Sequence, residues 1–465
     1  MNHKTITAIL GIAVFTATIV LPAPAQLDQH AWWTAGLAMM MALFWIGEVL
    51  PLAITALLPL IIAPILGLTD LKSVGANYGH PLIFLFLGGF VLGLSMERWS
   101  LHRRIALGLT VLFGGGVRRQ LATFMGATAF LSMWVSNTAT AIMMLPIALS
   151  ILSLNTDPSN SRQDRPLLLG IAYSASIGGI ATLIGTPPNA LMAAYLADVH
   201  NIHLSFVGWM AMAVPLSAAL LLAAWLWLSR QLPRGDGSIQ LEALRQQWQA
   251  LGPMTPMQWR VALVFIITAG LWITRPLFEN ALPDISLSDT SIALIAAVAL
   301  HTIPAADGKG SRLMDWDHTR RLPWGVLLLF GGGLALAHLM TVSGLAETLA
   351  QTLQGLGSWP LLALIFAVVG VIMFLTEVTS NTATAAAFLP LIGSLAVAVG
   401  APPEALVVPA ALAASCAFML PVATPPNAIV FGAERLTVGE MARTGFVINV
   451  LAWLGIGVLG WVLIW

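Results

Sequence analysis

Long apolar runs separated by short polar stretches make up most of the chain. A membrane-spanning helix needs about 20 consecutive apolar residues. Runs near or above that length lie at 6–24, 32–48, 50–68, 81–101, 166–197, 205–229, 258–277, 288–304, 323–345, 404–433 and 441–465. The pattern therefore predicts an all-α polytopic membrane protein with about 11 transmembrane helices.

The first of these runs has two interpretations. Lys4, the apolar stretch after it and the small residues at 22–25 are typical of a cleaved secretory signal. The same stretch also reaches the lower limit of length for a membrane span. We prefer a retained first helix, and both interpretations leave the later topology unchanged.

Two further apolar segments, 119–154 and 358–399, are awkward as single spans but suit two half-depth helices each. The phrase Ser-Asn-Thr-Ala-Thr lies near the middle of both, at 136–140 and at 380–384. Irregular backbone at membrane depth is tolerated where it lines a cavity. We predict that each segment is a re-entrant helical hairpin with the phrase at its tip.

A second phrase, Thr-Pro-Pro-Asn-Ala, follows each hairpin, at 186–190 and at 424–428. The first phrases are 380 − 136 = 244 residues apart and the second are 424 − 186 = 238 apart. Two phrases that repeat in the same order at nearly the same offset indicate an internal duplication. We expect one membrane domain, 1–465, with a first repeat at 32–230, a second at 258–465 and a polar cytoplasmic linker at 231–257.

The basic residues indicate how the chain is oriented. With the N-terminus in the cytoplasm and each hairpin returning to its own side, 18 of the 20 Lys and Arg residues lie inside. Only Lys72 and Arg275 lie outside, as the positive-inside rule requires. Five spans separate the hairpins, so the second repeat is inverted relative to the first. The C-terminus then lies outside.

Composition supports a lipid-facing surface and excludes several classes of protein. Hydrophobic residues make up 58% of the chain and charged residues 9%, whereas soluble proteins average about 25% charged. The net charge of zero argues against nucleic acid as a partner, and the single cysteine excludes an internal disulfide. We expect a multi-pass protein of the plasma (inner) membrane, surrounded by lipid, without an organic cofactor.

The hairpin tips suit anions. Ser and Asn favour helix N-termini, and a helix that begins at the tip presents free N–H groups and the positive end of its dipole. Two inverted copies bring two such ends to one site. The arrangement favours a small molecule with two anionic groups.

The broken helices suit cations. Pro187 and Pro188, like Pro425 and Pro426, interrupt a helix and free carbonyl groups, which with hydroxyl and amide oxygens attract a hard cation such as sodium. Neither motif contains Lys or Arg, and we expect nothing basic near the middle of the membrane. A dianion there needs co-bound cations. Ser132 and Thr376, each four residues before a tip serine, are candidate cation ligands.

Two other polar residues have open roles. Glu377 is the one acidic residue near a motif, and it either attracts a cation or carries a proton, or else shapes the hairpin through neighbouring donors. We weigh these interpretations equally. His338, within a predicted span, is more typical of a packed or hydrogen-bonded residue than of a ligand.

The residues at 414–430, ASCAFMLPVATPPNAIV, and the two Ser-Asn-Thr tips resemble the divalent-anion/sodium symporter family of INDY-type di- and tricarboxylate transporters. The resemblance covers nearly the whole chain. It implies a first sodium site from Ser132, Ser136, Asn137 and Gly185, and a second from Thr376, Ser380, Asn381 and Ala423. It implies substrate contacts from Ser136, Asn137, Thr138, Ser380, Asn381 and Thr382, with Thr424 and Pro425 nearby.

The same resemblance implies a homodimer that works as an elevator, in which hairpins and following spans slide against a dimeric scaffold. The leading hypothesis is a sodium-coupled symporter that imports C4-dicarboxylates such as succinate, fumarate or malate. The alternatives are a sodium-independent dicarboxylate exchanger or a carrier of citrate, tartrate or sulfate. An intramembrane hydrolase is a remote alternative because no acid/base pair accompanies the motifs. A channel fits less well still.

Overall fold

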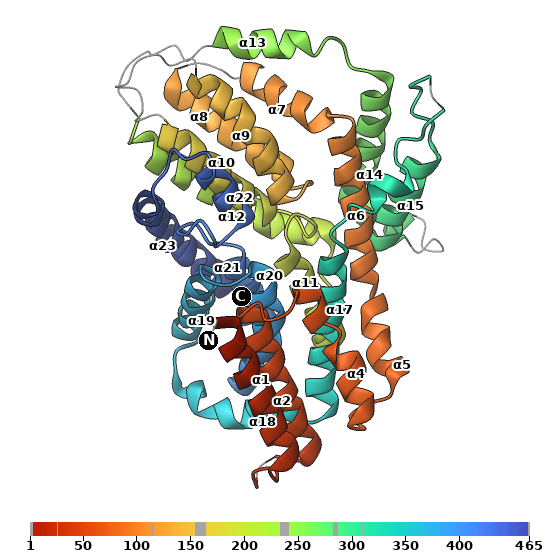
Figure 1. Ribbon diagram of the computed structural model, residues 1–465, viewed down its shortest axis with the longest axis vertical. Helices are drawn as coiled ribbons and strands as arrows, with labels where there is room; N and C mark the ends of the chain where they lie inside the picture. The colour runs from red at the N-terminus through yellow and green to blue at the C-terminus, as the bar shows by residue number, and fades with distance from the viewer. Residues whose placement is uncertain are drawn as a thin grey trace.

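The computed structural model describes residues 3–25, 27–112, 116–153, 164–232, 241–281, 287–308 and 310–463. These residues form helices and their connections, with one isolated β-bridge between Pro304 and Arg312 (Figure 1). The all-α prediction is confirmed. In the described part of the chain, six helices are long and apolar enough to cross a membrane, and six shorter apolar helices accompany them.

Most predicted spans correspond to single helices with nearly the expected bounds. They are α1 (His3–Val20), α2 (Gln29–Ile46), α6 (Pro81–Arg98), α12 (Phe206–Ser229), α14 (Pro256–Ala281), α15 (Asp289–Thr302), α17 (Trp324–Val342) and α23 (Val438–Val462). Short elements complete the connections: α5 (Leu71–Ala76), η1 (Asn77–Gly79), α16 (Trp316–Thr319) and η3 (Gln354–Ser358).

The segment at 50–68 differs from the single span expected, because it folds into α3 (Leu52–Thr55) and α4 (Leu58–Ile65). Pro59 lacks an N–H group and cannot continue the hydrogen-bond ladder from α3. The interruption has a packing partner. A Cβ on Gly332 of α17 would lie 2.4 Å from the Ala56 carbonyl oxygen, so this close approach requires glycine.

Both predicted hairpins are present. The first consists of α8 (Val117–Ser132) and α9 (Asn137–Ser153), and the second of α19 (Leu361–Thr376) and α20 (Asn381–Ala398). In each, the turn between the helices contains the serine of the Ser-Asn-Thr phrase, and the second helix begins at its asparagine. We call these pairs hairpin 1 and hairpin 2.

The helix after each hairpin is broken, as the proline pairs predict. The first consists of α10 (Asp164–Gly179) and α11 (Pro187–His200), and the second of α21 (Pro403–Ala414) and α22 (Pro425–Phe431). Each second half begins at the first proline of its pair, where the missing N–H costs nothing. The breaks at 180–186 and 415–424 therefore leave irregular backbone beside the hairpins.

Three further helices were not predicted from the apolar pattern because they are short or amphipathic. They are α7 (Leu101–Leu112), α13 (Leu241–Ala250) and α18 (Leu345–Leu353). Helix α7 is held to the connection between α13 and α14 by Arg104, which is only 7% exposed. Its guanidinium donates to the carbonyl oxygens of Gly252 (2.8 Å) and Leu251 (2.9 Å) and to Gln258 Oε1 (2.9 Å).

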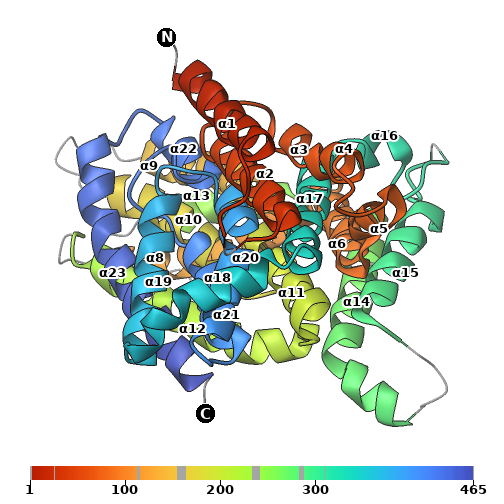
Figure 2. The same cartoon turned by 90° about the horizontal axis from the view of Figure 1, so that it is seen from below.

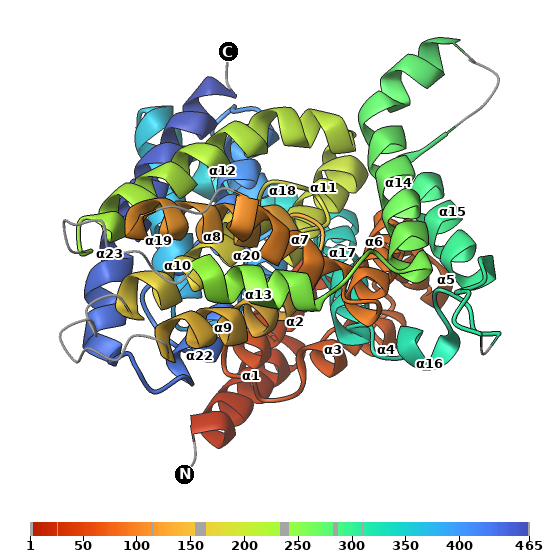
Figure 3. The same cartoon turned by 90° about the horizontal axis from the view of Figure 1, so that it is seen from above.

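Helices α4–α6 and α14–α16 lie together on one side of the molecule, and the hairpins with α10, α21 and α22 lie on the other (Figures 2 and 3). Helices α11 and α17 run between the two groups. The start of α10 is joined to the region around α23 by ion pairs between Arg165 and Glu440 and between Arg435 and Asp164. These ion pairs join the start of the first broken helix to the segment that follows the second.

Candidate functional site

Both hairpin tips and both helix breaks line one central cavity of about 1000 Å³. The residues of the motifs that line it are Ser136, Asn137, Thr138, Gly185, Thr186, Pro187, Ser380, Asn381, Thr382, Ala423, Thr424, Pro425, Pro426 and Ala428. The fold therefore brings together segments that are more than 200 residues apart in the sequence. Of the predicted site residues, only Ser132 and Thr376 do not line the cavity, and both lie directly behind it.

Ser132 belongs to a trio of oxygen atoms at the tip of hairpin 1. Its hydroxyl oxygen lies 2.7 Å from Asn137 Oδ1 and 2.7 Å from the carbonyl oxygen of Ala175 in α10. Both neighbours are acceptors, and one hydroxyl carries a single proton. The hydroxyl can donate to only one of them at a time, and three oxygen atoms this close together are a cluster of the kind that a hard cation binds.

The same trio occurs at hairpin 2. The Thr376 hydroxyl oxygen lies 2.7 Å from Asn381 Oδ1 and 3.0 Å from the carbonyl oxygen of Ala414 in α21. Ser132 and Thr376 are fully buried. Neither Ala175 nor Ala414 was predicted as a ligand. Every residue has a carbonyl oxygen, so the residue type does not indicate which one lies at the tip. Only the fold could identify these two.

Glycines let the break in the first broken helix approach its hairpin. A Cβ on Gly179 would lie 2.4 Å from Asn137 Oδ1, and one on Gly185 would lie 2.4 Å from the Gly179 carbonyl oxygen. Any larger residue at either position would displace Asn137 or the break itself. Gly185 thus packs against Gly179, and Gly179 packs against Asn137.

The asparagine of each Thr-Pro-Pro-Asn-Ala phrase holds its break in shape. Asn189 Nδ2 donates to the Thr182 carbonyl oxygen (2.8 Å), and Asn427 Nδ2 donates to that of Leu420 (2.9 Å). Both asparagines are fully buried. Among the described residues, neither Oδ1 atom has a hydrogen-bond partner. Each break thus keeps one uncommitted acceptor oxygen.

We expected the tip residues to act as helix N-caps, and the tip serine does so in hairpin 1 but not in hairpin 2. Ser136 Oγ accepts a hydrogen bond from the Ala139 N–H (3.2 Å), whereas Ser380 at the start of α20 makes no side-chain cap bond. At the breaks, Thr424 caps α22 by accepting from the Asn427 N–H (3.2 Å), and Thr186 does not cap α11. The Ser380 hydroxyl is therefore not used by its own helix.

Glu377 is buried and surrounded by hydrogen-bond donors. Its carboxylate accepts from the backbone N–H groups of Phe418 (2.8 Å), Met419 (3.1 Å) and Leu420 (3.0 Å), and from Asn449 Nδ2 (2.7 Å). All three backbone groups belong to the second helix break. This geometry favours the interpretation that Glu377 shapes the site over the one in which it carries a proton.

Charged residues outside the two motifs also line the central cavity. Lys4, Glu48 and Arg321 line the cavity and are exposed. They lie near helix ends, at the start of α1, after α2 and before α17, so they mark the open end rather than the tips. His338 lines a separate cavity of about 400 Å³ beside the His80–Asp198 ion pair, away from the tips.

Comparisons with known proteins agree with this geometry. Residues 2–465 match the family model described as "Sodium:sulfate symporter transmembrane region". The chain is 40% identical to the sodium-dependent dicarboxylate transporter SdcS of Staphylococcus saprophyticus and 39% identical to SdcS of Staphylococcus aureus (strain USA300). Each alignment covers 96% of this chain and 88% of the relative.

Among solved structures, the fold is similar to that of the Alcanivorax borkumensis YdaH transporter, with a TM-score of 0.60. The match covers 99% of this chain and 98% of that chain at 16% sequence identity. At this identity the likeness concerns the fold alone. It agrees with the all-helical architecture described above.

Proposed function

Since the chain belongs to the sodium:sulfate symporter family of secondary transporters, and is therefore not an enzyme, we propose that it imports small dianions together with sodium. C4-dicarboxylates such as succinate, fumarate and malate are the substrates that the comparisons support best, because relatives that are 39–40% identical are named sodium-dependent dicarboxylate transporters. The observation that carries the proposal is the pair of matched oxygen trios on one cavity.

Each trio is the core of one sodium site. The first site consists of Ser132, Ser136, Asn137 and Gly185, and the second of Thr376, Ser380, Asn381 and Ala423. The carbonyl oxygens of Ala175 and Ala414 add one ligand to each. Hydroxyl, amide and carbonyl oxygens are the ligands that hard cations prefer. Two sodium ions supply the positive charge that the tips lack.

The dianion lies between the tips, in contact with both. Its carboxylates face the first turns of α9 and α20, where backbone N–H groups and helix dipoles favour negative charge. The contacting residues are Ser136, Asn137, Thr138, Ser380, Asn381 and Thr382, with Thr424 and Pro425 at the edge. Asn137 and Asn381 each serve one cation and the substrate.

The architecture supports an elevator mechanism. We assign residues 32–230 and 258–465 to two inverted repeats, residues 231–257 to a cytoplasmic linker, the N-terminus to the cytoplasm and the C-terminus to the outside. The distribution of basic residues and the matched element order of the two halves support this assignment. The hairpins and broken helices then move as one body against a scaffold that forms a homodimer.

The test is uptake of labelled anions into proteoliposomes with and without an inward sodium gradient. The proposal predicts sodium-dependent accumulation of succinate, with weaker uptake of sulfate, citrate and tartrate. A preference for sulfate over succinate would still agree with sodium coupling but would contradict the proposed substrate. Succinate counterflow that is the same without sodium would instead indicate an exchanger and would contradict coupling to sodium.

A further inference from the structure

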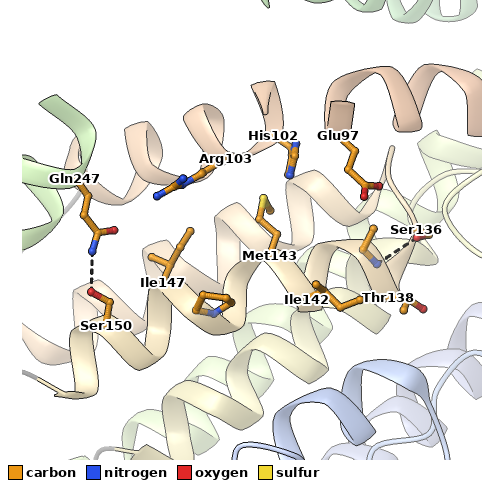
Figure 4. A pocket seen from close by; sticks show the side chains of 12 residues that line it. Glu97, His102, Arg103, Ser136, Thr138, Ile142, Met143, Ile147, Ser150 and Gln247 are labelled. Carbon is orange, nitrogen blue, oxygen red and sulfur yellow. Dashed lines mark hydrogen bonds between the residues drawn. The ribbon is translucent and has the colours of Figure 1, made fainter. Parts of the chain in front are cut away.

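A second cavity of about 760 Å³ lies behind the tip of hairpin 1, between α7 and α9 (Figure 4). We call it the α7–α9 groove. At one end it reaches Ser136 and Thr138, which also line the central cavity. Its other end is closed by α13, where Gln247 Nε2 donates to Ser150 Oγ (2.7 Å). The groove therefore adjoins the proposed transport site at Ser136 and Thr138.

The α9 wall of the groove is apolar. It is formed by Ile142, Met143, Pro146 and Ile147, which recur at helical spacing along one face of α9. Ile142 is 57% exposed, so a large apolar side chain is uncovered here. This wall suits a hydrocarbon chain rather than a small polar solute.

The facing wall is charged. Arg103 and His102 of α7 and Glu97 of α6 point from it across the groove toward α9 (Figure 4). Arg103 lies toward the Gln247 end and Glu97 toward the hairpin tip. Burial lowers the pKa of His102, whose Nδ1 is bonded to the Met96 carbonyl oxygen (2.8 Å). At neutral pH, one fixed positive and one negative charge thus face opposite ends of the groove.

We propose that the α7–α9 groove binds a single-chain monocarboxylate amphiphile, such as a medium-chain fatty carboxylate. Its carboxylate meets Arg103 and the amide of Gln247 at the α13 end, and its apolar chain lies along α9 toward the tip. A dicarboxylate fits poorly, because its second carboxylate would meet either the apolar wall or Glu97. The groove and the central cavity therefore select different anions.

An occupant of the groove would act on transport. Helix α7 is fixed to the α13–α14 connection by Arg104, whereas α9 carries one tip of the proposed site. A ligand wedged between them couples α9 to α7 and opposes movement of hairpin 1. We expect it to slow uptake without competing with the dianion. This consequence depends on the proposed function, but the binding itself does not.

The first experiment measures binding to the purified protein. Decanoate should raise the midpoint of thermal unfolding, and Arg103→Gln should raise the decanoate concentration needed by about two- to fivefold. Arg119→Gln is the matched control, since Arg119 is also exposed but lies outside the groove. Butyrate, which lacks the chain, and decanol, which lacks the charge, should each have little effect. Equal responses of both variants, or of decanol, would overturn the proposal.

The second experiment measures succinate uptake in proteoliposomes with decanoate present. The maximal rate should fall while the KM for succinate stays constant, and Arg103→Gln should relieve the inhibition where Arg119→Gln does not. Competition with succinate would place decanoate in the central cavity instead and contradict the assignment. If the protein binds decanoate but takes up no succinate, the proposed function is refuted, whereas the proposed ligand of the groove is supported.

Discussion

The two hairpins carry the same oxygen trio but are supported in different ways. Ser132, Asn137 and a carbonyl of the first broken helix correspond atom for atom to Thr376, Asn381 and a carbonyl of the second. The residues just beyond the trio do not correspond. The comparison shows that the proposed ion-binding chemistry is duplicated, whereas the structure that holds it in place is not.

The first difference concerns the connection between the hairpin and the helix break. Glu377 of hairpin 2 accepts hydrogen bonds from three backbone N–H groups of its break, and Met133 occupies the matching position (377 − 244 = 133) in hairpin 1. Hairpin 1 also accepts from its break, but through its backbone, because the Thr182 hydroxyl of the break donates to the Met133 carbonyl oxygen (2.5 Å). Hairpin 2 holds its break through a charge and hairpin 1 through a neutral hydrogen bond.

The second difference concerns what covers each tip. Trp134 stacks on Phe206 (ring centroids 6.1 Å apart) and meets Phe265 of α14 edge-on (5.1 Å), and it is 8% exposed. The matching residue in hairpin 2 is Val378, which is 65% exposed and lines the central cavity. Hairpin 1 is therefore docked on an aromatic cluster, while the tip of hairpin 2 borders open space.

The largest expected effect tests the shared part of the two hairpins. Asn137→Ala and Asn381→Ala should each lower sodium-driven succinate uptake about 100-fold, which corresponds to about 3 kcal/mol of lost cation and substrate binding. Asn201→Gly is the control, since Asn201 ends α11 in a left-handed conformation (φ 56°) that glycine adopts freely. A variant at one tip that keeps normal uptake would show that the two trios are not equivalent.

The next largest effect compares how much each hairpin tip contributes to the stability of the protein. Trp134→Ala should destabilise the protein by about 3–5 kcal/mol, because it empties a space within an aromatic cluster. Val378→Ala should change stability by less than about 0.5 kcal/mol. Thermal unfolding of the two purified variants measures the difference. Similar losses for both would mean that hairpin 2 is as firmly docked as hairpin 1.

Glu377→Gln tests the charged support of hairpin 2. The amide NH₂ group would face backbone N–H groups that need an acceptor, at a cost of about 1–3 kcal/mol. Met133→Gln, at the corresponding place in hairpin 1, should be close to neutral. The thermal midpoint and the sodium dependence of uptake should both change for Glu377→Gln, and unchanged values would refute its role in positioning the second site.

The smallest effect concerns single cation ligands. Ser132→Ala and Thr376→Val each remove one oxygen of a trio, at a cost of about 1 kcal/mol, so half-maximal uptake should need about fivefold more sodium. Ser174→Ala is a control for Ser132, since the Ser174 hydroxyl bonds only within α10, to Gly170. A shift for one site variant and not the other would show that the two sites differ in their importance for coupling.

Much of this arrangement was predictable from the sequence because it depends on repetition and hydrophobicity. The repeated phrases located both hairpins, and the proline pairs located both helix breaks. The proposed carbonyl ligands, those of Ala175 and Ala414, were not predictable, since every residue has a carbonyl group and only the fold brings a particular one to the site. The partners of Glu377 are backbone groups for the same reason. The aromatic cover of Trp134 depends on α12 and α14, which have no local relation to the tip.

The amphipathic helix α7 was also missed, and with it the groove behind hairpin 1. Its polar residues interrupt the apolar pattern that identified the spans. Arg103 and Arg104 are neighbours in the sequence, yet one is exposed in the groove and the other is buried and holds α7 in place. The sequence contains no sign of this difference, because it depends on which face of α7 meets the linker.

The central claim is that each trio binds one sodium ion for every dianion carried. The most direct test determines the succinate gradient that just balances a fixed sodium gradient in proteoliposomes held at zero membrane potential. With two sodium ions per succinate, a tenfold sodium gradient should be balanced by an opposing succinate gradient of about 100-fold, since each ion contributes about 1.4 kcal/mol. Balance at about tenfold would leave one trio without a coupled ion, and balance without any succinate gradient would contradict sodium coupling altogether.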